Sequence, residues 1–271
     1  MKTNQWPVRA LIFVCLLQVI SCTKTVDTTT QDSTSLESSS DATVDNEFSD
    51  CKLRRIYHAH GGSPEVTVSG LFTYNAAGNP YSLTYGNGTG TGNPNHYFYY
   101  DKKNRLREYR IAYSPDDPVE ATWHRYGYDE NDVIIVDTSF GAPLIGENGQ
   151  PLPNDTVVST LTYDDQGRII KESIRFLNRP FPPRNPTYTY DNRGNLGVIG
   201  WKSSWYDTKV SFFRSHPLFM FLARNYSMNN PYNPEAAGRK YNSRKLPLSI
   251  NAGNDFFFNT IDIYKLIYDC Q

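Results

Sequence analysis

Two histidines with one residue between them are the first side chains in this chain whose spacing could support chemistry. In His58-Ala59-His60 both imidazoles would project from one face of a strand, a spacing that can hold zinc. A zinc site needs a third or fourth ligand, and none is identifiable nearby. Because Gly61-Gly62 then ends the strand, we interpret the pair as two exposed edge histidines. We expect neither a metal nor a cofactor.

An acidic run, Asp129-Glu130-Asn131-Asp132, resembles part of a calcium loop. It lacks the twelve-residue pattern with its closing Glu, and it falls where the chain makes a recurring turn, so we interpret it as turn chemistry. The other carboxylates form no recognisable acid–base pair, and no nucleophile elbow, P-loop or dinucleotide fingerprint occurs. Since paired carboxylates can lie far apart in sequence, these observations weaken the case for an enzyme but leave it open.

Cys22 is the clearest candidate for covalent modification. Lys2 and Arg9 precede an apolar run over residues 10–20, which is shorter than the roughly 20 residues that span a bilayer and has the layout of a secretory signal. Val19-Ile20-Ser21-Cys22 resembles the bacterial lipobox, in which the cysteine is acylated and becomes the new N-terminus. The alternative is an ordinary cleaved signal with an incidental cysteine. We predict a signal peptide over 1–21 and a lipid anchor at Cys22, each buried CH₂ contributing about 0.8 kcal/mol.

Cys51 and Cys270 are the cysteines that remain after Cys15 leaves with the signal and Cys22 takes lipid. In an oxidising compartment they form a natural pair. A bond between them closes a loop of 219 residues, which stabilises by about 4–5 kcal/mol in the chain-entropy model. In a flat meander the terminal strands would be too far apart for cysteine Cα atoms to come within about 7 Å. The predicted disulfide therefore favours a curled or closed sheet.

Residues 22–50 form the predicted link between anchor and folded domain. Residues 23–50 contain one Lys and seven acidic residues, a net charge of −6, with almost no large apolar side chains. Such a segment cannot offset the entropy cost of ordering, so it should be a flexible acidic Ser/Thr-rich tether.

A recurring motif, Tyr-Asp-x-x-Gly-(Arg/Asn), must position whatever the folded region carries. Its tyrosines are separated by 26, 28, 35 and 27 residues, which indicates a repeated supersecondary unit. The five copies begin at Tyr74, Tyr100, Tyr128, Tyr163 and Tyr190.

Each copy predicts a β-hairpin, because segments of period-two alternation flank it. Asp can hydrogen-bond its own backbone to open the turn, and Gly, Asn or Asp accepts the positive φ that closes it. The tyrosine ring should cover the sheet while its hydroxyl stays in water. The predicted turn residues are Asp101, Asn104, Asp129, Asp132, Asp164, Gly167, Asp191 and Gly194.

On these motifs the chain resembles the YD-repeat (Rhs-like) proteins over about residues 65–205. It is similar, more closely, to Bacteroidota lipoproteins of unknown function with degenerate YD-like repeats. The segments Trp205-Tyr206-Asp207, His216-Pro217-Leu218-Phe219 and Asn229-Asn230-Pro231 share this resemblance. It implies serial antiparallel hairpins and says almost nothing of activity. Five copies are far fewer than large Rhs shells contain, so a closed toxin shell is not implied.

The resemblance also bears on the tether. Asp27-Thr28-Thr29 and Asp32-Ser33-Thr34 are similar to sites that are O-glycosylated in that phylum, although a plain acidic tether is the default interpretation. The family's surface-export signal is an acidic cluster directly after the lipidated cysteine. Thr23-Lys24-Thr25-Val26 lacks such a cluster, which leaves a periplasm-facing location open.

Residues 51–271 should form a single all-β domain, long enough to bury one core. Its net charge of +3 is spread along the strands, so we expect no nucleic-acid partner, and we expect a monomer. The apolar run 217–222, with Ser215 and Pro217 placed like a helix start, predicts a short helix or apolar loop that plugs one end of the sheet. An exposed partner-binding patch is the alternative. We expect a loop from Asn229 to Asn242, and then strands at 256–258 and 261–268.

Function is not specified by any motif. All 20 tyrosines lie in the folded region, and aromatic faces can bind sugars, but in a curled sheet most rings should cover their neighbours. The leading expectation is a non-enzymatic lipid-anchored protein of the outer membrane that serves as a binding or structural module. The alternative is a carbohydrate-active enzyme or glycan-binding accessory protein. The expected partners are the membrane and either a glycan or an envelope protein.

Overall fold

The computed structural model describes residues 51–60, 63–86, 94–115, 122–141, 155–197, 206–231, 239–250 and 263–270. They belong to a compact unit, Asn46–Gln271. The predicted signal peptide, Cys22, the tether, Trp205 and the strand at 256–258 lie outside the described residues. No helix in the described ranges is long and apolar enough to cross a membrane.

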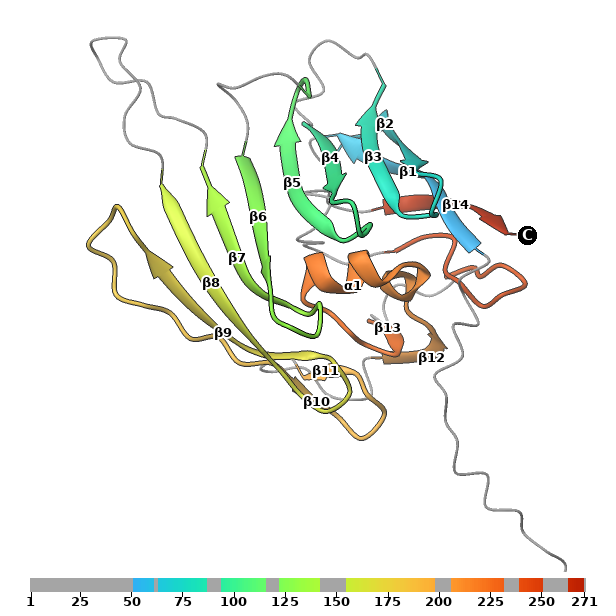
Figure 1. Cartoon of the computed structure of the whole chain (residues 1–271). Coiled ribbons are helices and arrows are strands. Elements are labelled where there is room, and N and C mark those ends of the chain that lie inside the picture. The colour runs from blue at the N-terminus through green and yellow to red at the C-terminus, as the bar shows by residue number, and fades with distance from the viewer. Residues whose placement is uncertain are drawn as a thin grey trace, which may run out of the picture. The chain divides into compact units, whose positions relative to one another are not determined.

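Ten strands form one antiparallel sheet with the order β14-β1-β2-β3-β4-β5-β6-β7-β8-β9 (Figure 1). This confirms the predicted all-β class and the antiparallel hairpins. The strands are β1 (Cys51–His60), β2 (Ser63–Tyr74), β3 (Pro80–Tyr85), β4 (Asn95–Tyr100), β5 (Leu106–Ala112), β6 (Thr122–Tyr128), β7 (Ile134–Phe140), β8 (Thr156–Tyr163), β9 (Ile169–Phe176) and β14 (Ile263–Cys270).

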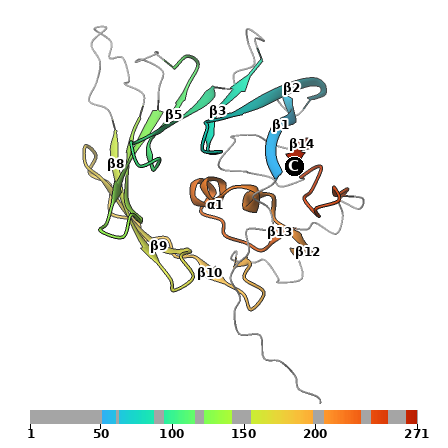
Figure 2. The same ribbon diagram turned by 45° about the vertical axis from the view of Figure 1, so that its right-hand side comes forward.

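The sheet is strongly curled but open (Figures 1 and 2). Its two edge strands are β9 and β14, so of the two predicted alternatives the curled sheet is observed and the closed one is not. The terminal strands β1 and β14 still lie side by side. They do so because β14, the last strand in the chain, returns to pair with β1 and does not continue beyond β9.

Both edges of the sheet are partly covered by irregular chain. On the outer side of β9, Arg184 N and O both bond with Ile174, and Tyr188 N donates to Ile170 O. On the outer side of β14, Leu266 N donates to Leu248 O. Pairing of this kind reduces the risk of edge-to-edge association.

All five predicted turns are present and share one construction. In the turn 101–105, Asp101 N donates to Arg105 O and Asn104 N donates to Asp101 O. The Asp101 Oδ1 atom accepts from Lys103 N and Arg105 N, both at 2.9 Å. Positive φ occurs at the predicted closing position of every copy: Gly78, Asn104, Asp132, Gly167 and Gly194.

A sixth turn of the same construction begins at Asn242, where the loop predicted from the sequence ends. Asn242 N donates to Leu246 O, the Asn242 side chain accepts from Arg244 N and Leu246 N, and Lys245 has φ of 64°. Tyr241 pairs with Pro247 across the turn. The signal that was missed is Tyr241-Asn242, because the first copy also has Asn in place of Asp.

The strand-end tyrosines differ from the prediction in one respect. Their hydroxyls are not in water but donate to backbone carbonyls of the neighbouring repeat, as Tyr128 does to Leu106 O at 2.6 Å and Tyr163 does to Ile134 O at 2.6 Å. The expectation of a wet hydroxyl was wrong, because the curl of the sheet brings each ring tip onto the preceding turn. Each bond satisfies a carbonyl at the point where the ladder ends.

The predicted short helix is present as α1 (Pro217–Ala223), preceded by a 3₁₀ helix (Phe212–Ser215). His216 caps α1, its ring accepting from Leu218 N, and Arg224 ends it at φ of 50°. The start is thus at His216-Pro217 and not at Ser215. The helix lies in the hollow of the curled sheet (Figure 2), where Phe219 contacts Phe72 with ring centroids 5.4 Å apart.

Two small sheets complete the described structure. β10 (Thr189–Tyr190) pairs with β11 (Leu196–Gly197), and β12 (Tyr206–Val210) pairs with β13 (Asn229–Pro231). The segment Asn229-Asn230-Pro231, predicted as loop, is therefore a short strand. It escaped prediction because its side chains carry the pairing: Asn230 Nδ2 donates to Val210 O at 2.7 Å.

Candidate functional site

The predicted turn residues are occupied by the turns themselves. Asp129 Oδ1 accepts from Asn131 N and Val133 N, both at 2.9 Å. Asp132 forms ion pairs with Lys103 at 3.3 Å and with Arg105. The acidic run at 129–132 is therefore turn chemistry, as predicted, and its oxygens face protein donors. The same Asp–backbone bonds recur at Asp164 and Asp191.

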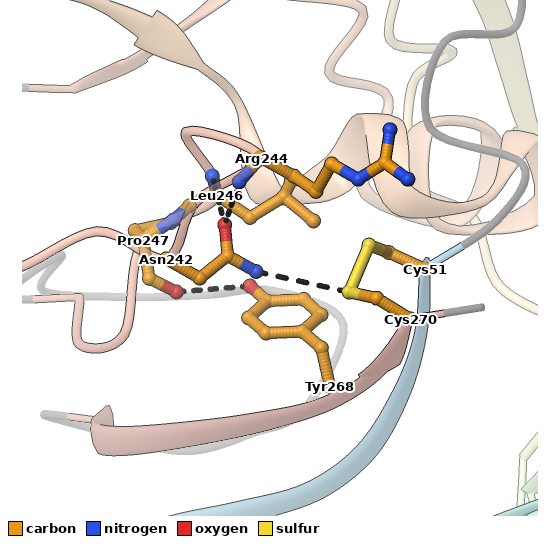
Figure 3. Close-up of a disulfide and its surroundings, with 7 residues drawn as sticks. All are labelled: Cys51, Asn242, Arg244, Leu246, Pro247, Tyr268 and Cys270. Atoms are coloured by element: carbon orange, nitrogen blue, oxygen red, sulfur yellow. Dashed lines mark hydrogen bonds between the residues drawn. A yellow bond between two sulfur atoms is a disulfide. The ribbon is translucent and has the colours of Figure 1, made fainter.

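Cys51 and Cys270 form the predicted disulfide (Figure 3), with Cα atoms 4.0 Å apart. Cys51 is buried and Cys270 is exposed. Figure 3 shows Tyr268 and Asn242 beside the bond; Tyr268 donates to Pro247 O at 3.0 Å. The pair joins the two terminal strands of the sheet.

His58 and His60 lie in a strand, as predicted, but the expectation of edge histidines was wrong, because β1 lies between β14 and β2 and the backbone of His58 pairs with Ile263 and Val68. The positions of their side chains lie outside what the structure describes. Within the described part of the chain, no group of three or more His, Cys, Asp or Glu side chains could hold a metal ion.

A buried charge cluster that sequence reasoning missed joins α1 to the far half of the sheet. Arg224, directly after the helix, donates to Asp137 on β7 at 2.8 Å and to Glu172 on β9 at 2.7 Å. The two carboxylates are 7% and 6% exposed, so their charges are almost fully desolvated. Tyr188 donates a further bond to Glu172 at 2.9 Å.

The electrostatics of this cluster follow from burial and pairing. Burial alone would raise the pKa of Asp137, but the hydrogen bond from His124 and the charge of Arg224 outweigh it and hold the pKa below its usual value. Burial acts in the opposite direction on Arg224, whose pKa is nevertheless raised by Glu172 and Asp137. Both partners therefore stay charged over the ordinary pH range.

His124 is the chemically most versatile side chain of the cluster. Its Nδ1 lies 2.8 Å from Asp137 Oδ1, and its ring stacks between Tyr109 and Tyr126 at 5.5 and 6.3 Å. The side chain is 25% exposed. With Nδ1 held by the carboxylate, Nε2 is the atom left to face a ligand, and no hydrogen bond to it occurs in the described structure.

His124 begins a half-exposed row across four strands, which we call the His124 strip. The strip is defined by three directly opposed pairs: His124 with Ser139, Ser139 with Val157, and Val157 with Phe176. Directly opposed residues share a face of the sheet, here the concave one. All four residues are half-buried.

In the row next to the strip, the two residues that α1 and Arg224 contact are buried, whereas Ser159 and Ile174 further along it are half-buried. The two buried residues are Tyr126 and Asp137, which are opposed in β6 and β7. Phe221 of α1 meets Tyr126 with ring centroids 5.3 Å apart, and Arg224 holds Asp137. The strip thus runs beside the two buried residues that contact Phe221 and Arg224.

The strip brings an imidazole, a hydroxyl and an aromatic ring onto one face of the sheet. These groups belong to His124, Ser139 and Phe176. The Arg184 guanidinium lies 5.6 Å from the centre of the Phe176 ring, and Phe181 meets that ring edge-on and is 54% exposed. In the described residues no hydrogen bond joins the Ser139 hydroxyl to His124.

The members of the cluster are 13, 35 and 52 residues apart in sequence, so no local motif could reveal them. One signal was visible. Glu172 alternates with Ile170, Ile174 and Phe176 on one face of its strand, and a carboxylate inside an apolar row needs a buried partner. The sequence gives no means to identify that partner as Arg224.

Comparison with known proteins gives limited information. No family model and no curated protein matches the chain. Among solved structures, the TcdB2-TccC3-Cdc42 complex matches with 13% identity and a TM-score of 0.29, over 68% of this chain and 9% of that chain. TcdB2-TccC3-TEV matches with 14% identity and a TM-score of 0.26, over 70% and 10%.

A Photorhabdus luminescens Tc holotoxin pore with a TccC3 mutation matches with 14% identity and a TM-score of 0.23, over 69% of this chain and 10% of that chain. The chain thus spans about a tenth of the length of these proteins. At such TM-scores the likeness carries no argument about the fold or the function of this chain.

Proposed function

We propose that this protein is a lipid-anchored binding module of the bacterial cell envelope, held in the outer membrane by Cys22 and an acidic tether over residues 22–50. It would belong with the Bacteroidota lipoproteins that carry degenerate YD-like repeats. The disulfide between Cys51 and Cys270 supports an envelope location, because such bonds persist in oxidising compartments.

The His124 strip is the observation that supports a binding function. Tyr126 and Asp137 are buried against Phe221 and Arg224, whereas the strip presents an oriented imidazole, a hydroxyl and an aromatic ring at half-buried positions. Convergent polar groups beside aromatic surface are typical of ligand sites. Asp137 bonds to His124 and is itself held by Arg224, and this chain of contacts orients the imidazole before any ligand binds.

A glycan is the ligand class that the strip favours, through the half-buried ring of Phe176 and the exposed ring of Phe181 beside it. Aromatic faces bind the apolar faces of sugars while hydroxyls and imidazoles bond to their oxygens. A glycan-cleaving enzyme has less support. Asp137 and Glu172 do face one hollow, but Arg224 occupies an oxygen of each.

Binding is tested with a glycan array probed with residues 23–271, produced without the predicted signal peptide and the lipidated cysteine. We expect retention on a defined set of glycans, lost on His124→Ala and on Phe176→Ala. Tyr99→Ala is the matched control, because Tyr99 lies on the opposite face of the sheet, beside Arg110. Binding that survives both strip variants, or is lost equally in the control, would contradict the proposed site.

Anchoring is tested separately by membrane fractionation. Cys22→Ser should release the protein or leave an uncleaved precursor, whereas Cys15→Ser, within the predicted signal, should leave mature membrane-bound protein. Mature membrane-bound protein in the Cys22 variant would overturn the anchor.

A further inference from the structure

The register of β14 on β1 is the register of a hairpin whose turn is missing. In each hairpin the strand-end tyrosine pairs with the residue six positions later: Tyr74 with Pro80, Tyr100 with Leu106, Tyr128 with Ile134, Tyr163 with Ile169 and Tyr190 with Leu196. In the terminal pair, Tyr268 is opposite Leu53. Tyr268 is followed by Asp269, which completes the Tyr-Asp signature.

The disulfide stands where the peptide turn stands elsewhere. Asp269 pairs with Lys52, as the Asp of a hairpin pairs with the basic or polar residue four positions on, for example Asp101 with Arg105. If Tyr268 is counted as position 0 and Leu53 as position 6 of a hairpin, Cys270 stands at position 2 and Cys51 at position 4, and the two cysteines oppose each other. The two bonded cysteines therefore stand where the three central residues of a hairpin turn stand, and the S–S bond bridges the one position that has no residue.

The tyrosine hydroxyls identify the same unit independently. Each strand-end tyrosine donates to the carbonyl of the residue that follows the preceding turn: Tyr100 to Pro80, Tyr128 to Leu106, Tyr163 to Ile134, Tyr190 to Ile169 and Tyr206 to Leu196. Tyr74 donates to Leu53 O at 2.7 Å. Leu53 therefore has the role of the first residue after a turn, although no turn precedes it along the chain.

The same hydroxyl contact also identifies a unit that precedes the split unit in space. Tyr268 donates to Pro247 O, and Pro247 is the residue after the Tyr241 turn. In spatial order the units are thus the Tyr241 turn, the split unit of Tyr268 and Leu53, and then the hairpins from Tyr74 to Tyr190.

We propose that the chain is a circular permutation of its own repeat series, and that the Cys51–Cys270 disulfide is a redox-sensitive substitute for the missing turn. Oxidation closes the split repeat. Reduction opens this repeat and loosens the β14 edge, while the hairpins closed by peptide stay folded. The proposal does not depend on the ligand or on the lipid anchor.

The geometry also assigns the sulfur at which the bond opens. Cys270 is exposed and Cys51 is 1% exposed, so the thiolate of a dithiol donor attacks Cys270 Sγ. The S–S bond breaks, and its electron pair leaves with Cys51 Sγ, which takes a proton. The second thiol of the donor then displaces Cys270 as a thiol, and the donor is oxidised to its own disulfide.

A circular permutant tests the split repeat. Asp269 is joined to Lys52 by Asn-Arg-Gly in place of both cysteines, and new ends are opened between residues 231 and 239. We expect its Tm to match that of the oxidised protein, whereas Cys51→Ser/Cys270→Ser should melt roughly 5–10 °C lower. A permutant that melts as low as the double serine variant would overturn the substitution of a turn by the disulfide.

Hydrogen exchange on the natural chain supplies a test that does not require the permutant to fold. Dithiothreitol should lower amide protection in β14 and in the Tyr241 turn, and leave protection in β4 to β9 within about twofold. Unchanged amide protection in β14 after complete reduction would refute the proposal that the disulfide substitutes for the missing turn. A uniform loss of protection across the sheet would also refute it.

Discussion

The two halves of the concave face are built from the same hairpin unit and hold α1 by different interactions. In the half from β2 to β5, Phe72, Phe98 and Tyr109 form an apolar core against Phe219, and all four are at most 4% exposed. In the half from β7 to β9, Arg224 holds the chain after the helix through Asp137 and Glu172.

The difference shows what the repeat specifies. The Tyr-Asp motif fixes the turn, the register and the hydroxyl contact with the neighbouring unit, and these features are alike in both halves. It leaves the inward-facing strand positions free. One half uses them for a hydrophobic core, and the other uses them for charges, beside which the His124 strip is left half-exposed.

The largest expected effect is a loss of unfolding free energy when a core side chain of the apolar half is truncated. Phe98 is fully buried and stacks on Tyr109 with ring centroids 5.1 Å apart. Phe98→Ala should lower the free energy of unfolding by about 3–5 kcal/mol, measured by urea titration. Ile174→Ala, at a half-buried position of the polar half, should cost clearly less. Equal losses would show that the polar half is packed as tightly as the apolar half.

Removal of the central cation should affect the polar half alone. Arg224→Met leaves two buried carboxylates unpaired and should cost about 3 kcal/mol. Adding Asp137→Asn and Glu172→Gln should restore most of that loss, because no charge is then left buried. Arg125→Met is the control: Arg125 is exposed and its Glu108 contact is 3.5 Å long, so the cost should be below about 1 kcal/mol. If the triple variant is no more stable than Arg224→Met, charge pairing is not what holds α1 there.

Alkaline pH should weaken the feature that both halves share. Burial raises the pKa of Tyr128, Tyr163 and Tyr190 to about 12, against about 10 in an unfolded chain. Their contribution to stability is therefore complete below pH 10 and is lost as the pH rises from 10 through 12. Urea titrations between pH 8 and 11.5 should show this fall, and Tyr163→Phe should reduce its slope. A flat profile up to pH 11.5 would contradict the buried hydroxyls.

The smallest effect concerns the turns. Gly167 has φ of +71° and an added Cβ would meet nothing within 4 Å, so Gly167→Val should cost about 1 kcal/mol through backbone strain alone. Gly194→Val should cost more, because its Cβ would lie 2.9 Å from Met228 Cγ. Thermal unfolding measures both. If Gly167→Val lowered the Tm more than Gly194→Val, backbone strain alone would not account for the cost at Gly167.

Most of the fold was predictable because its signals are local. A turn needs an Asp or Asn and a residue that tolerates positive φ within five positions, and five such turns could be located from the sequence. The sixth was missed because Asn242 and Lys245 replace both signature residues. The helix was predicted from a dense apolar run, but its place in the hollow depends on Phe219 meeting Phe72 across 147 residues.

The candidate site was not predictable in the same way. Asp137 and Arg224 look like ordinary surface charges in sequence, Glu172 shows only that it needs a buried partner, and the curl of the sheet brings the three together. The sequence by itself determined the repeat, its turns and the pairing of Cys51 with Cys270, since these follow from short-range backbone chemistry and from the count of cysteines. Only the tertiary structure decided that β14 returns beside β1, that the disulfide replaces a turn and that His124 bonds to Asp137. Those outcomes depend on contacts between residues far apart in the chain, which no local preference encodes.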